Sequence, residues 1–137
     1  MAEISVADRL AIESLVTEYA WLLDHRQFEA VLSLFAENPE LKIRGQKIHG
    51  AEGLQAWLDQ RATSQGRRAS LHQMSLLRLD ELDADNVRGT AALVLHVAKS
   101  GGSGSYVDFV GEYQDDYVRT SDGWRFRSRV LVSMADM

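Results

Sequence analysis

The chain has 137 residues, a formal net charge of −5 and no cysteine. This length suits a single domain over residues 1–137, and the missing cysteines exclude disulfides, thiolate nucleophiles and cysteine metal sites. The acidic balance argues against nucleic-acid binding. Without a signal-like N-terminus or an apolar run near 20 residues, we expect a cytoplasmic protein with no membrane span.

Helical periodicity opens the chain. Apolar residues at helical spacing from Ile4 to Leu23 form a broad stripe, which predicts a helix packed on a sheet. Asp24 and Gln27 then match a capping box, which predicts a short second helix that Asn38-Pro39 ends.

A hairpin and a third helix follow. Alternation over 41–44 and 47–49 around a Gly45 turn predicts the hairpin, and Leu54, Trp57 and Leu58 mark the helix. A polar loop is expected over 63–68. The nearest approach to a basic patch, Arg61 with Arg67 and Arg68, is interpreted as a solvated helix end.

The second half of the chain alternates with period two. It predicts four long strands joined by short turns: Ser70–Leu79, Asn86–Lys99, Ser105–Arg119 and Trp124–Met134. Consecutive strands with short turns indicate an antiparallel meander. Helices followed by such a sheet make an α+β domain with the helices on one face.

Four local motifs accompany this order of elements: Tyr19-Ala20-x-x-x-Asp24, Leu34-Phe35-Ala36, Ile48-His49-Gly50-Ala51-Glu52-Gly53, and Tyr117-Val118-Arg119 running through Asp122-Gly123-Trp124-Arg125-Phe126. Together they resemble the SnoaL-like branch of the nuclear-transport-factor-2-like superfamily. The resemblance covers nearly the whole chain. It implies a cone-shaped α+β fold in which N-terminal helices and a curved, mostly antiparallel sheet enclose an apolar pocket.

The chain is most similar in motif to the lyases of this superfamily, namely scytalone dehydratase, bile-acid 7α-dehydratase and hexachlorocyclohexane dehydrochlorinase. Asp24 and His72 lie 48 positions apart, as in the last two. The resemblance implies that Asp24 supports His72 as a base, that Tyr19 belongs to the site and that Arg129 lines it. Scytalone dehydratase has a second histidine where this chain has Val97; His96, one residue earlier, faces the opposite side and is left out.

Each of these residues also has a structural interpretation. An N-cap explains Asp24, and His72 is in phase with Met74 and Leu76 as an apolar-face strand residue that needs a partner. Tyr19 suits a core aromatic. Arg129 alternates with two other arginines and points outward by parity, unless a bulge turns it inward.

These observations predict a cofactor-independent lyase that performs a dehydratase-like β-elimination on an apolar cyclic small molecule, such as a steroid, polyketide or aromatic-derived compound. His72 is the base and Asp24 orients it. Two alternatives remain: an isomerase or cyclase with the same dyad, and a non-catalytic binding or assembly subunit resembling dioxygenase small subunits. The histidines lack metal-ligand spacing, so no metal is expected. A homo-oligomer, dimer or trimer, is expected from the long open sheet.

Overall fold

The computed structural model describes residues 3–63 and 69–137. Its elements, in chain order, are α1 (Val6–Asp24), the 3₁₀ helix η1 (Phe28–Leu34), β1 (Phe35–Ile43), β2 (Gln46–His49), α2 (Gly50–Thr63), β3 (Ser70–Asp83), β4 (Asn86–Ala98), β5 (Ser105–Thr120), β6 (Gly123–Ser133) and the 3₁₀ turn η2 (Met134–Asp136). Most of the predicted polar loop over 63–68 lies outside the described residues. No helix among those described is both long and apolar enough to cross a membrane.

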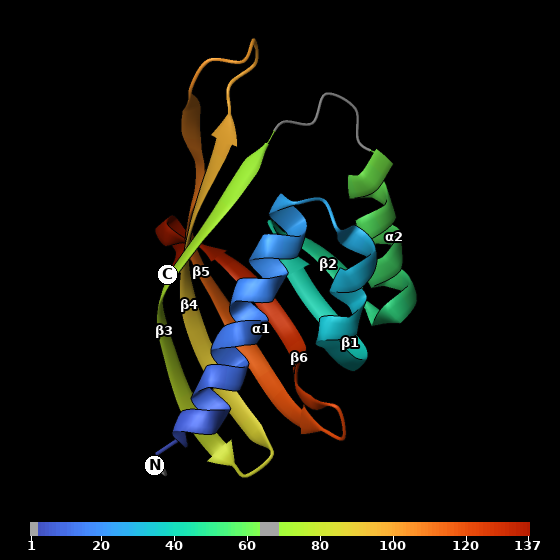
Figure 1. Cartoon of the computed structure of the whole chain (residues 1–137), viewed down its shortest axis with the longest axis vertical. Coiled ribbons are helices and arrows are strands. Elements are labelled where there is room, and N and C mark those ends of the chain that lie inside the picture. Colours follow the sequence, from blue (N-terminus) through green and yellow to red (C-terminus); the bar gives the residue numbers. More distant parts are fainter. Residues whose placement is uncertain (1–2, 64–68) are drawn as a thin grey trace.

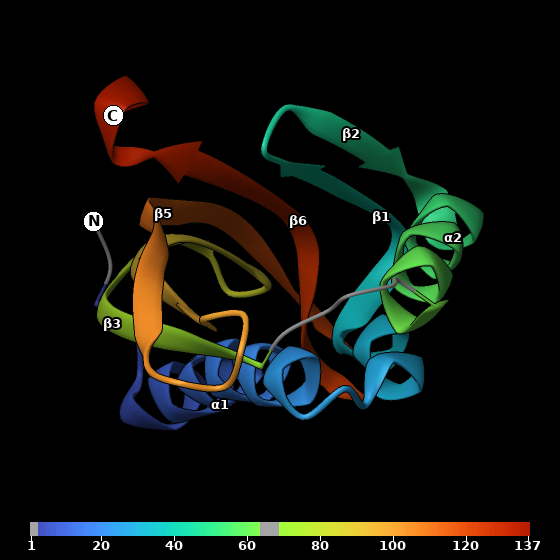
Figure 2. The ribbon, with the colours of Figure 1, turned by 90° about the horizontal axis from the view of Figure 1, so that it is seen from above.

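One six-stranded sheet organises the fold. Its strand order is β2-β1-β6-β5-β4-β3, and every neighbouring pair is antiparallel except β1 and β6, which are parallel. Helix α1 lies across one face of the curved sheet, and α2 lies beside β1 and β2 (Figures 1 and 2). The predicted α+β class with helices packed on a mostly antiparallel sheet is confirmed.

The buried face of α1 holds the core together. Its inward residues Ile12, Leu15, Val16, Tyr19, Leu22 and Leu23 join buried side chains of the sheet in one cluster. Leu10, which belonged to the predicted stripe, is exposed. The helix therefore buries the C-terminal part of that stripe most deeply, and this brings Tyr19 and the end of the helix toward the interior.

The segment after α1 differs from the prediction. Asp24 is the last residue of α1, while η1 begins after Gln27 without any side-chain capping bond, so the predicted capping box is wrong. Asn38-Pro39 does not end the helix either. It lies inside β1, where Asn38 has a positive φ of 56° and the pairing with β6 is interrupted, as a proline within a strand requires.

Two of the bulges in the sheet, one in β6 and one in β3, change which side chains face the interior. In β6, Arg127 falls between consecutive positions of the β5 pairing and has no partner of its own. The extra residue reverses the alternation, so Trp124 and Phe126 are buried before it and Arg129 and Leu131 after it. The bulge thus turns Arg129 inward, against its parity in the sequence.

The second bulge lies in β3. Leu76 has a positive φ of 53° and is 81% exposed, while Leu77 packs against the core. The pairing with β4 shifts at the same place. Leu76 therefore does not share the face of His72 and Met74, as its phase had suggested.

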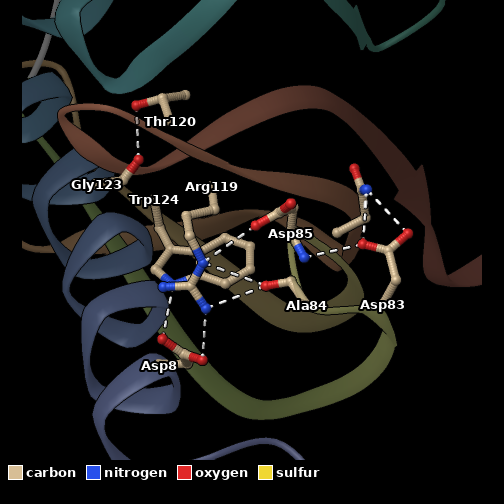
Figure 3. A network of polar contacts seen from close by, with 9 residues as sticks. Asp8, Asp83, Ala84, Asp85, Arg119, Thr120, Gly123 and Trp124 are labelled. Atoms are coloured by element: carbon tan, nitrogen blue, oxygen red, sulfur yellow. Dashed lines mark hydrogen bonds and ion pairs between the residues drawn. The ribbon is translucent and has the colours of Figure 1, made fainter.

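Polar contacts fix the N-terminal end of α1 to the sheet (Figure 3). Asp8 accepts hydrogen bonds from the Arg119 guanidinium at 2.9 Å and from the Trp124 indole at 3.0 Å. Arg119 also donates to the carbonyl oxygen of Ala84 in the β3–β4 turn. Helix, turn and the β5–β6 hairpin are joined at this end, and the opposite end of α1 carries Asp24.

Candidate active site

The carboxylate of Asp24 and the imidazole of His72 are in direct contact at the C-terminal end of α1. Asp24 Oδ1 lies 2.6 Å from His72 Nδ1. The backbone N–H of His72 donates to Oδ2 at 2.8 Å, and the Ser70 hydroxyl donates to Oδ1 at 3.0 Å. Because β3 starts beside the last turn of α1, two residues that are 48 positions apart in sequence meet here.

The environment keeps Asp24 ionised. Its side chain is 5% exposed and that of His72 is 13% exposed. Burial opposes the negative charge, but hydrogen bonds from the ring and backbone of His72 and from Ser70 lower the pKa of Asp24 below its usual range. An ionised carboxylate at Nδ1 holds the imidazole in one orientation and favours the tautomer with its proton on that nitrogen.

A cavity of about 310 Å³ opens beside His72. Its apolar lining comes from α1, η1, β1, α2, β4 and β6: Leu23, Phe28, Ile43, Trp57, Leu93, Leu95, Val97 and Leu131. Because Nδ1 contacts Asp24, Nε2 is the nitrogen available to a ligand. None of the residues in the described ranges hydrogen-bonds to Nε2.

Two tyrosines add polar groups to this lining. Tyr19 and Tyr113 are buried, and their ring centres lie 6.0 Å apart in an edge-to-face arrangement. Burial raises the pKa of both phenols, so both stay protonated near neutral pH. The Tyr19 hydroxyl has no hydrogen-bond partner within the described part of the chain.

Arg129 lies behind these tyrosines and does not line the cavity. It is fully buried, and its Nε and Nη2 donate to the two carboxylate oxygens of Asp115 at 2.7 and 3.0 Å. Its guanidinium carbon lies 3.7 Å from the ring centre of Tyr113 and 4.4 Å from that of Tyr19. Burial opposes the charge of Arg129, but Asp115 outweighs it and raises the arginine's pKa.

Three arginines that sequence analysis did not select line the same cavity: Arg26, Arg44 and Arg61. Arg44 forms an ion pair with Asp108 at 2.6 Å, and the Arg61 guanidinium lies 4.1 Å from the ring centre of Trp57. Trp57 and Arg61 are four residues apart on α2, so they lie on one face of the helix. That spacing was the available signal. In the sequence alone, Arg61 fits a solvated helix end equally well, because Arg67 and Arg68 follow it.

The model of the SnoaL-like domain family matches residues 5–130. The chain belongs to the SnoaL-like domain family. Over 135 residues, this SnoaL-like domain is 30% identical to an uncharacterized protein of Mycobacterium tuberculosis, and the match covers 95% of this chain and 86% of the relative.

Solved structures agree with the family. The SnoaL-like domain superimposes with a TM-score of 0.80 and 25% identity on LinA, a hexachlorocyclohexane dehydrochlorinase, covering 93% of this chain and 86% of LinA. A Novosphingobium aromaticivorans protein described as a scytalone dehydratase gives a TM-score of 0.82 at 20% identity, with 94% of this chain and 85% of the other covered. The predicted nuclear-transport-factor-2-like fold is confirmed. The predicted resemblance of the chain to the SnoaL-like family is confirmed as well.

The remaining histidines of the SnoaL-like domain lie away from the cavity. His96 contacts Gln73 through Nε2 at 2.9 Å, while its neighbour Val97 lines the cavity. His25 follows α1 and stacks on Trp21, and His49 pairs with Glu40. Among the described residues, no three potential metal-ligating side chains cluster together.

Proposed function

We propose that this SnoaL-like domain is a cofactor-independent lyase that eliminates water or another small leaving group from an apolar cyclic molecule. The observation that carries the proposal is the 2.6 Å contact between Asp24 and His72 at the wall of a cavity. A neutral imidazole held by a carboxylate is suited to remove a proton from carbon near neutral pH.

His72 and Tyr19 can account for every proton that moves in the elimination. Nε2 of His72 takes a proton from the carbon next to the one that bears the hydroxyl. The C–H electron pair becomes the new carbon–carbon double bond, and the C–O bond breaks. If the imidazolium gives its proton to the departing oxygen, water leaves and His72 is neutral again. If Tyr19 gives the proton, water leaves and the imidazolium then returns a proton to the Tyr19 phenolate, which also restores neutral His72. Asp24 stabilises the imidazolium between these steps.

Tyr19 and Arg129 receive different roles. Tyr19 lines the cavity with a protonated phenol, which suits a proton donor or a group that positions the substrate. Arg129 is a positioning residue, since it packs on the rings of Tyr19 and Tyr113 from behind and holds them in place without touching the substrate.

The size and lining of the cavity support a compact cyclic substrate. A cavity of about 310 Å³ is at the lower end of the range typical of small-molecule sites. Its apolar wall suits a ring system of the steroid, polyketide or aromatic-derived type.

Exposed apolar residues on β3 and β5, namely Leu71, Val107 and Val110, support the expectation of a homo-oligomer. Light scattering after size-exclusion chromatography tests this expectation.

A screen of hydroxylated steroids and polyketides tests the function. Against any substrate found, His72→Ala is expected to lower kcat by about 10²–10⁴-fold, the usual contribution of a general base. His96→Ala is the matched control and retains the parental rate, because its imidazole lies off the cavity. Equal turnover by His72→Ala and the parent contradicts the assignment of the base.

Product analysis separates the alternatives. Release of water or halide marks an elimination, whereas a product of unchanged mass marks an isomerase or cyclase that uses the same dyad. Binding without conversion across the screen, with no effect of His72→Ala, favours a non-catalytic binding subunit.

A further inference from the structure

Positive charge gathers around the cavity of an acidic protein. The chain has a formal net charge of −5, yet Arg26, Arg44 and Arg61 all line this one cavity, against a single acidic lining residue, Asp108. The proposed elimination at His72 uses none of these arginines. A cluster of this kind is what recognition of an anionic ligand requires.

Two of the three arginines are held by neighbouring groups. Arg44 is neutralised by Asp108 at 2.6 Å and also lies over the Phe109 ring, at 5.0 Å from its centre. Arg26 donates to the backbone carbonyl of Arg61 at 3.3 Å, at the C-terminal end of α2. Arg26 therefore joins the loop after α1 to the helix that carries Arg61.

Arg61 differs from both. Its guanidinium rests on the Trp57 indole, and no carboxylate of the described residues lies within ion-pair distance of it. The segments 1–2 and 64–68 contain no aspartate or glutamate. Arg61 thus presents a positive charge to the cavity without an acidic partner from its own chain.

We propose that Arg61, supported by Arg26, binds a carboxylate of the substrate at the wall of the cavity formed by α2. The inference rests on the proposed function only in calling this ligand a substrate. A planar guanidinium stacked on an aromatic ring keeps its hydrogen-bonding edge free for a bidentate contact, which a carboxylate matches. The substrate is then an apolar ring acid, with the ring against the leucines and Trp57 and the reacting carbon toward His72.

The experiment compares two ligands of equal ring size, 2-naphthoate and 2-naphthamide, by isothermal titration calorimetry. The wild-type protein is expected to bind the carboxylate at least about tenfold more tightly than the amide. Arg61→Gln is expected to remove this preference and leave the affinity for the amide unchanged. Arg61→Lys retains part of it, because the charge remains but the bidentate contact is lost.

Arg88→Gln is the matched control, since Arg88 is exposed on β4 and pairs with Asp116 away from the cavity. It keeps the full preference. The inference is overturned if the wild type binds both ligands equally, if it fails to bind naphthoate, or if Arg61→Gln retains the preference. His72→Ala is expected to keep the preference. Failure of the base assignment and failure of carboxylate binding therefore appear in separate measurements.

Discussion

The carboxylates of Asp24 and Asp115 both lie close to the cavity, and they bind their partners in different surroundings. Asp24 contacts His72 where the imidazole still reaches the cavity. Asp115 forms a bidentate pair with Arg129 in which neither side chain has any exposed surface. The imidazole of the first pair faces the cavity, whereas the second pair lies enclosed beneath the aromatic rings that line the cavity.

The buried pair makes a prediction about stability. Asp115→Asn leaves the Arg129 guanidinium buried without its counter-ion, which typically costs about 3–5 kcal/mol. We expect a loss of that size in the free energy of unfolding, measured with urea near neutral pH.

Asp116→Asn serves as its control on the same strand. Asp116 pairs with Arg88 on the surface, where such a pair contributes only about 0–1 kcal/mol. Equal losses in the two variants would show that the Asp115–Arg129 pair does not depend on burial for its effect.

At the residue scale, the sequence predicted which two side chains meet but not which arginines line the cavity around them. The separation of Asp24 and His72 pointed to a pair that the structure places in contact, although the local pattern favoured a helix cap for Asp24. That cap is absent because α1 continues through Asp24 and the next helix starts later. The arginines around the cavity were not predicted, because which way a surface arginine faces depends on elements distant in the sequence.

At the scale of whole elements, the strands were predictable and their bulges were not. Alternation located β3 to β6 within a few residues, since each strand has one buried face. A single extra residue in β6, Arg127, reverses that alternation. The sequence of polar and apolar residues around Arg127 does not indicate it. The inward position of Arg129 therefore required the pairing of β5 with β6 to be known.

The close approach of these two strands makes a second prediction. A Cβ at Gly111 in β5 would collide with the carbonyl oxygen of Val132 and lie 2.8 Å from the Phe109 ring. Gly111→Ala is therefore expected to lower the free energy of unfolding by about 1–3 kcal/mol. Thermal and urea unfolding both measure this loss.

Gly53→Ala in α2 is the contrasting substitution. Its added methyl group would meet Ile48 at an ordinary 3.9 Å, and alanine favours a helix over glycine by up to about 1 kcal/mol. It should leave stability unchanged or raise it. A Gly111→Ala protein as stable as the parent would mean that β5 and β6 separate easily at this point.

Across the whole molecule, α1 is fixed at both ends by carboxylates. Asp24 joins its last turn to β3, and Asp8 joins its first turn to Arg119 and Trp124 at the far end of the sheet (Figure 3). The hydrogen bonds from Arg119 and Trp124 lower the pKa of Asp8. The position of the helix across the sheet thus depends on two acids remaining ionised.

The contact at Asp8 predicts how stability varies with pH. Because the pKa of Asp8 is lowered in the folded protein, its contribution is fully present above the pKa of the unfolded chain. It is lost as the pH falls through the lower folded value. We expect Asp8→Asn to be less stable than the parent near neutral pH, and the difference to shrink below about pH 4.

Urea unfolding at a series of pH values measures this difference. Asp136→Asn, at the exposed C-terminal end, is the control and follows the parent at every pH. A difference between Asp8→Asn and the parent that stays constant into acid would show that the contact does not depend on ionisation. Asp24 still titrates in both proteins, so the comparison isolates Asp8.

The main-chain bond from His72 to Asp24 has a practical outcome. That N–H belongs to every amino acid except proline, so truncating the side chain at position 72 leaves the aspartate anchored and the first strand of the meander attached to the helix. The His72→Ala protein is expected to keep its fold and to have an empty space where the imidazole ring was. Free imidazole added to the solvent is then expected to bind in this space, next to the Asp24 carboxylate.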